Sequence, residues 1–251
     1  MTDPLESSRY SLEHAHRRIR ELESEVAAFG ALNPYAERID IDAKTAEQVL
    51  KVKLIKPMPR PWSGIAVDAV GALRSALDQD GFAVALAAGT KGKNGHFPFG
   101  GNLADTLLRK VKGRSKDIPQ EIFDVMIASQ PYRGGNDLLW GLNKLSNIHK
   151  HEIIVPLVTS SSGFQMTDVV ITGPLTVGAR WDSSKNELEV ARISPGGKLE
   201  GKFTYSFFVA IGDVELVGGQ PAIGFLDGVA SEVERILMAI EAEARRIGIF
   251  N

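Results

Sequence analysis

The stretch WGLNKLSNIHKHE, residues 140–152, marks the point at which the pattern of the chain changes from helix to strand. Before it, apolar residues recur three or four positions apart, which predicts a helix over about 137–148. Beyond it, apolar and polar residues alternate in short runs separated by Gly, Ser, Asn and Pro, a pattern typical of strands. The chain therefore divides into a helix-rich part, about 1–150, and a strand-rich part, about 151–223.

The same periodicities place the remaining elements. Apolar spacing predicts further helices at residues 12–29, 63–88, 103–111, 119–129 and 225–247. Alternation predicts strands at residues 48–56, 153–159, 164–172, 175–181, 188–193 and 203–211. The C-terminal helix carries one apolar stripe, formed by Val229, Val233, Ile236 and Ile240.

These elements predict an α+β fold. No helix-sized crossover separates consecutive strands after His151, so they are expected to pair antiparallel in one sheet. We expect the N-terminal helices to pack on this mainly antiparallel sheet and the helix of about 225–247 to close the fold by packing on it. The strand near Val52 is expected to join an edge of the same sheet, which makes residues 1–251 a single domain.

Charge and composition limit the classes of partner. The 251 residues include 29 Lys and Arg against 31 Asp and Glu, a net charge of −2, so any nucleic-acid or anionic-membrane binding needs a local patch. The absence of cysteine excludes disulfides and thiolate metal sites. No apolar run reaches the roughly 18 residues of a membrane span, and the N-terminal residues lack a signal peptide. We expect a soluble cytoplasmic protein without membrane contact or cofactor, whose open partners are a small anionic ligand or another protein.

Arg74 is the first candidate site residue. A helical wheel of the helix over 63–88 places it inside an apolar stripe, where a guanidinium must be paired or must reach solvent. Asp78 lies one turn further on and is the expected partner. The pair is either a structural tie between helices or an anion-binding arginine held in place by Asp78.

Two of the five histidines, His149 and His151, lie where the helix over 137–148 ends. If the backbone is already extended there, they share one face of a strand and form a His-x-His pair that can chelate a metal, but no third ligand is marked by spacing. The alternatives are a buried structural histidine with a surface one, or an acid–base site. His96, in the glycine-rich stretch GKNGHFPF, is interpreted as part of a flexible surface loop, because the spacing of a phosphate-binding loop is absent.

Three motifs in order, LRSALD (73–78), FPF (97–99) and LNKLSNIHKH (142–151), resemble those of a widespread bacterial family of uncharacterised proteins. In that family the first motif usually reads close to HNLRSALDH and the last close to LSNIDKHR. Its arginine followed five residues later by histidine is similar to the RxxxxH signature of HEPN-type ribonucleases, which implies metal-independent cleavage of RNA. This chain has Gln79 at the histidine position, and glutamine cannot act as a general base. The family's polar residues retained here are Arg74, Asp78, Asn147, Lys150 and His151.

We therefore predict a non-catalytic ligand- or partner-binding protein with one polar cluster at a helix junction. The predicted cluster consists of Arg74, Asp78, Asn147, Lys150 and His151. The alternative is a HEPN-like or other phosphodiester hydrolase, with Arg74 stabilising charge and His149 or His151 transferring protons. No metal site is predicted.

Overall fold

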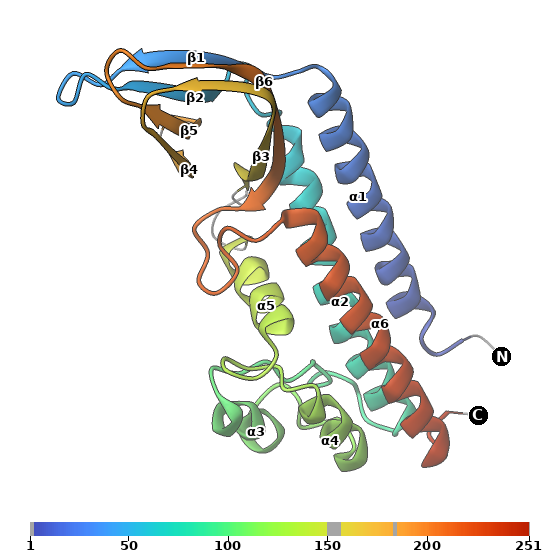
Figure 1. Ribbon diagram of the computed structural model, residues 1–251. Coiled ribbons are helices and arrows are strands. Elements are labelled where there is room, and N and C mark those ends of the chain that lie inside the picture. Colours follow the sequence, from blue (N-terminus) through green and yellow to red (C-terminus); the bar gives the residue numbers. More distant parts are fainter. Residues whose placement is uncertain (1–2, 150–156, 183–184, 251) are drawn as a thin grey trace. The chain divides into compact units, whose positions relative to one another are not determined.

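The computed structural model describes residues 3–149, 157–182 and 185–250 (Figure 1). The chain forms two compact units. The first, the helical unit, comprises Met1–Glu23, Pro61–Pro156 and Ile211–Asn251; the second, the β unit, comprises Ser24–Arg60 and Leu157–Ala210. The single-domain organisation stays a prediction, because it depends on how these two units associate.

The helical unit is built around α2 (Pro61–Ala87), which contacts both α5 (Asp137–His149) and α6 (Ala222–Arg246). Helix α1 (Glu6–Ala31) runs beside α2, where Ser11 Oγ donates to Gln79 Oε1 over 2.8 Å. Helices α3 (Leu103–Lys112) and α4 (Gln120–Ala128) follow the loop after α2 (Figure 1). The predicted helices are therefore present, with ends shifted by a few residues.

The apolar stripe of α6 is buried as the sequence predicted, through Val229, Val233, Ile236 and Ile240. Its partners in the helical unit are α2, α4 and α5, where the sequence analysis expected the sheet. The reason is that an apolar stripe specifies burial but not the kind of element that covers it.

Among its described residues the β unit contains six strands: β1 (Tyr35–Ile41), β2 (Gln48–Leu54), β3 (Leu157–Thr172), β4 (Leu175–Asp182), β5 (Glu187–Ile193) and β6 (Lys198–Ile211). Four of them pair antiparallel in the order β1-β2-β5-β4. The long strands β3 and β6 form a separate two-stranded sheet. The predicted α+β class with antiparallel pairing and a C-terminal helix is confirmed.

Two details of the strand prediction are corrected. The strands after residue 151 belong to two sheets rather than one. Strand β1 was not predicted, and because it pairs along the whole of β2, the strand containing Val52 lies inside its sheet and not at the edge. Three of the seven residues of YAERIDI are charged, as an edge strand with solvent-facing side chains permits. The alternation of apolar and polar residues that marks a strand is therefore weak in this segment.

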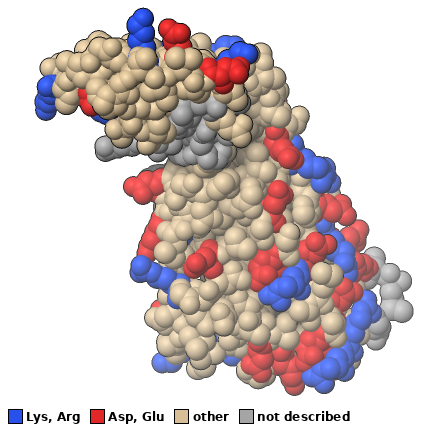
Figure 2. Space-filling model, in the orientation of Figure 1, with Lys and Arg blue, Asp and Glu red and all other residues tan. Residues whose placement is uncertain are grey.

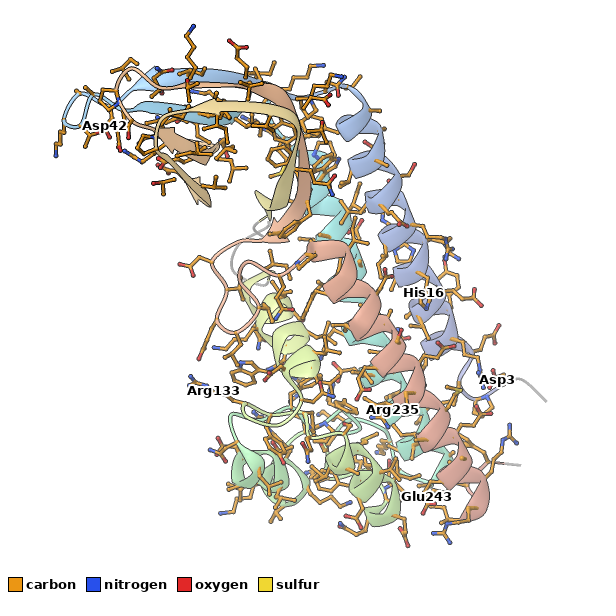
Figure 3. The ribbon with its side chains drawn as sticks, in the orientation of Figure 1. Asp3, His16, Asp42, Arg133, Arg235 and Glu243 are labelled. Atoms are coloured by element: carbon orange, nitrogen blue, oxygen red, sulfur yellow. The ribbon has the colours of Figure 1, made fainter. Side chains whose placement is uncertain are left out.

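The four-stranded sheet separates apolar from charged side chains. A buried cluster of Leu50, Val52, Leu188, Val190 and Ala191 is joined by Tyr35, Leu175, Leu199 and Phe207. The rings of Tyr35 and Phe207 stack at a centroid distance of 3.7 Å, which ties β6 to β1. Charged side chains of the sheet pair with one another, as where Arg192 contacts Asp42 at the turn after β1 over 2.8 Å (Figure 3).

One carboxyl group is buried inside the helical unit without a partner. Asp80 on α2 is fully buried, and neither of its side-chain oxygens has a hydrogen-bond partner among the described residues. Burial raises the pKa of Asp80 well above its usual range; the negative charge of Glu241 raises it further, and Arg9 opposes this. The native protein therefore holds Asp80 in its neutral form above the pH at which an aspartate normally ionises.

Candidate functional site

A pocket with a volume of about 620 Å³ lies in the helical unit. It is formed by α2, the loop that follows it, α3, the turn after α3, and α5. Its described lining consists of Arg74, His96, Phe97, Phe99, Gly100, Gly101, Arg109, Arg114, Ser115, Trp140, Asn143, Lys144 and Asn147. Four of these side chains are basic and none is a carboxylate, so the lining is strongly cationic.

Arg74 projects from α2 into this pocket and makes the predicted contact with Asp78. Its Nε donates to Asp78 Oδ2 over 3.2 Å, and its Nη1 donates to Asn143 Oδ1 on α5 over 2.9 Å. The guanidinium lies over the ring of Phe99, 3.9 Å from the centroid. The side chain keeps 19 % of its surface exposed, so the pair is partly rather than fully buried.

Burial and neighbouring positive charges both disfavour the charged form of Arg74. Burial lowers its pKa, the ion pair with Asp78 raises it, and the nearby charges of Arg114 and Arg109 lower it. Since an arginine stays protonated in proteins, the three guanidinium groups repel one another across the pocket. An anion placed between them would remove that repulsion.

Asp78 holds the loop after α2 in place. Its Oδ1 accepts a hydrogen bond from the backbone N–H of Phe97 over 3.0 Å and lies 3.7 Å from Nδ1 of His96. Its other oxygen faces Arg74. One carboxylate therefore connects the arginine of α2 with the loop that forms another wall of the pocket.

His96 and Arg114 are brought together by a backbone connection. The N–H of His96 donates to the carbonyl oxygen of Arg114 over 2.9 Å, and Ser115 Oγ donates to the carbonyl oxygen of His96 over 2.7 Å. Arg114 Nη2 and His96 Nε2 are then 3.0 Å apart. Because a guanidinium only donates, Nε2 is the acceptor and the proton of a neutral His96 is on Nδ1, facing Asp78.

The loop reaches this position through a close approach of two glycines. A Cβ atom on Gly81 of α2 would lie 2.3 Å from the carbonyl oxygen of Gly95. Only the lack of a side chain at Gly81 allows the backbone of the loop to lie against the helix. Phe97 and Phe99, which follow directly, are buried beside the pocket.

Two of the pocket's cations have no carboxylate within ion-pairing distance among the described residues. These are Arg109 on α3 and Arg114 after it, whereas Lys144 on α5 pairs with Glu215 over 3.1 Å. Glu215 is shared with Arg133 (Figure 3), 2.8 Å away. The positive charges of Arg109 and Arg114 are therefore not neutralised by any carboxylate of the described residues.

Side chains of α5 add polar groups of another kind. Asn147 Nδ2 donates to Asn143 Oδ1 over 3.4 Å, so Asn143 accepts from both Asn147 and Arg74. In the described part of the chain, the indole N–H of Trp140 has no hydrogen-bond partner. The pocket thus combines cations with amide and aromatic groups.

The structure brings three members of the predicted cluster together, Arg74, Asp78 and Asn147. Lys150 and His151 lie outside the described residues, as does the side chain of His149. The sequence analysis missed Arg109, Arg114, Asn143, Lys144 and Trp140 as neighbours of Arg74, and it assigned His96 to a flexible surface loop. The buried aromatic pair in FPF was the available signal that this loop packs against the core.

The positions that correspond to the RxxxxH signature do not face one pocket. Arg74 lines the pocket described above, whereas Gln79 lines a second pocket between α1 and α2, together with Ser11 and His14. Residues five positions apart on a helix point about 140° apart, which explains the separation.

Comparison with known proteins assigns no relative: no protein-family model, curated protein or solved structure matches the chain. The described residues contain no group of three or more His, Asp or Glu side chains that is arranged to hold a metal ion. A search of the same residues finds no helix with the length and apolar character needed to cross a membrane.

Proposed function

We propose that the protein binds a small anionic ligand, with phosphate-type oxygens, in the pocket that contains Arg74. The observation that carries the proposal is the pair Arg109 and Arg114, whose guanidinium groups line the pocket. The described lining contains no carboxylate. Neither arginine forms an ion pair with any of the described residues. Guanidinium groups bind phosphate and carboxylate oxygens through paired N–H donors. A volume of about 620 Å³ suits a metabolite-sized molecule.

The contacts of Arg74 support a binding role for the pocket as a whole. Asp78 and Asn143 each accept one of its hydrogen bonds and Phe99 covers one face of the guanidinium. Such a side chain loses little conformational freedom when an anion binds, because it is already ordered. Arg74 thus serves as a fixed positive charge, while Arg109 and Arg114 close on the ligand.

The test is isothermal titration calorimetry with inorganic pyrophosphate as the probe. Arg109→Gln and Arg114→Gln should each weaken binding by roughly tenfold or more, because each removes a charge-assisted contact. Arg235→Gln, which changes an exposed arginine on α6 (Figure 3), is the matched control and should leave binding unchanged. Equal affinities for all four proteins, or no binding by the unaltered one, would refute the proposal.

The alternative is a phosphodiester hydrolase, and one observation favours it: His96 lines the same pocket as Arg74 and Arg114. With Arg114 turned from His96 toward the phosphate, Nε2 of His96 would be free to take a proton from an attacking water while the arginines stabilise the phosphorane charge. His149 and His151 remain the histidines proposed from the sequence. Hydrolysis of bis(p-nitrophenyl) phosphate that is lost in His96→Gln, with pyrophosphate binding retained, would favour this alternative.

A further inference from the structure

Helix α3 presents its apolar side to solvent. Four large apolar side chains form a stripe along α3. Their exposed fractions are 45 % for Leu103, 45 % for Leu107, 52 % for Leu108 and 70 % for Val111. At 100° per residue these four side chains lie within an arc of about 140°. On the face shown in Figure 2 the surface over α3 is largely tan, the colour of uncharged residues.

Only a narrow polar strip of α3, formed by Thr106 and Lys110, packs against the protein. Thr106 is the one buried residue of this helix, and Arg109 lines the cationic pocket. Lys110 Nζ donates to the carbonyl oxygen of Ile118, and burial lowers the pKa of this lysine. An amphipathic helix of a globular protein normally buries its apolar stripe, so the exposed stripe on α3 indicates a surface that meets an apolar partner.

The partner must also suit a positive charge. Residues 102–117 include five basic and two acidic residues, a net charge of +3, whereas the whole chain carries −2. Exposed basic side chains, Arg109, Lys112, Arg114 and Lys116, accompany the stripe on α3 and the turn that follows it. An apolar stripe bordered by basic residues matches the boundary between the headgroups and acyl chains of an anionic membrane.

In contrast to the expectation of no membrane contact, we propose that the helical unit docks on an anionic lipid surface through α3. The stripe of Leu103, Leu107, Leu108 and Val111 enters the headgroup region, and the pocket beside it receives a lipid phosphate. This inference rests on the proposed function, since it assigns the anion of the pocket to a phospholipid headgroup. Arg109 connects the two features, because it projects from the stripe's own helix into the pocket.

Charge argues against a second copy of the chain as the occupant. In a two-fold dimer formed through α3, the same patch with its net charge of +3 would face itself, and like charges would be brought together as the stripe was buried. A lipid surface supplies opposite charge and an apolar phase at once. An acidic protein partner is distinguished by the experiment.

The experiment is co-sedimentation with vesicles of phosphatidylcholine alone and of an equal mixture of phosphatidylcholine and phosphatidylglycerol. The protein should sediment with the mixed vesicles and not with phosphatidylcholine. The double variant Leu107→Ser/Val111→Ser should weaken vesicle binding by roughly tenfold or more, because two inserted side chains are lost. Met238→Ser, which removes an apolar side chain on α6 that is 55 % exposed, is the matched control and should bind as the unaltered protein does.

The outcomes separate this inference from the proposed function. If pyrophosphate binds the pocket but no vesicle sediments the protein, the lipid surface is refuted and small-anion binding stands. If the double variant and Met238→Ser bind vesicles equally, α3 is not the docking element. If light scattering detects a dimer that Leu107→Ser/Val111→Ser dissociates, the stripe belongs to an interface with a second copy. If the same double variant loses binding of an acidic protein, the stripe belongs to that partner. Either result overturns the proposal.

Discussion

Asp80 makes the stability of the helical unit depend on pH in an unusual direction. In the unfolded chain its carboxyl group ionises near its ordinary pKa, about 3.9, whereas burial raises the native pKa well above that value. Between these two pKa values the native state holds one more proton than the unfolded state. The free energy of unfolding therefore falls as pH rises through this interval.

The substitution Asp80→Asn removes this dependence because the amide has nearly the same shape and does not ionise. One proton gives a slope of at most about 1.4 kcal/mol per pH unit, so the advantage of the variant should grow by up to about 3 kcal/mol between about pH 5 and about pH 7. Below the ordinary pKa of aspartate the difference in stability between the two proteins should no longer change with pH. Glu241 and Arg9, whose charges act on Asp80, are present in both proteins, so the pH dependence of their own ionisation largely cancels in the difference.

The measurement is urea-induced unfolding at a series of pH values, followed by tryptophan fluorescence. Trp62 and Trp140 both belong to the helical unit. Asp80→Ala is the control for the amide, since it is also uncharged at every pH and should show the same pH dependence despite a different stability. Parallel curves for the unaltered protein and Asp80→Asn would refute the assignment of a neutral buried carboxyl.

Two further changes test the packing around the pocket. Arg74→Ala removes the ion pair with Asp78 and one further hydrogen bond, so urea unfolding should show a loss of about 2 kcal/mol, less than for a fully buried pair; an unchanged midpoint would contradict this. Gly81→Ala should destabilise by about 1–3 kcal/mol because its Cβ would clash with Gly95. Gly71→Ala on the same helix, where an added Cβ would have no atom within 4 Å, should stabilise by about 0.5–1 kcal/mol. If Gly71→Ala were the more destabilising of the two substitutions, the close-approach argument would be refuted.

The sequence predicted the elements of the helical unit well because each carries a periodic apolar signal. The stripe on α6 and the pairing of Arg74 with Asp78 both follow from helical spacing alone. Spacing along one element does not reveal which other element lies opposite. For this reason the partners of α6 were expected in the sheet, and Arg109, which α3 contributes to the pocket, was not expected near Arg74.

Two other differences have local causes. Strand β1 lies at the edge of its sheet, where most of its side chains face solvent and the apolar alternation is weak. The loop that carries His96 is rich in glycine, a composition that flexible loops share with loops fixed by close backbone contact. Distinguishing these cases requires the distance between Gly81 and Gly95, which depends on tertiary structure.

The contact between these glycines also bears on how the pocket can change its specificity. The loop is seated on α2 by main-chain atoms, and its next turn is held by backbone hydrogen bonds to the segment after α3. Side chains at positions 96, 109 and 114 face the pocket without setting the course of the backbone that carries them. For a pocket that binds an anion as proposed, substitutions at these three positions would change which ligand is preferred and leave the backbone of the pocket walls in place.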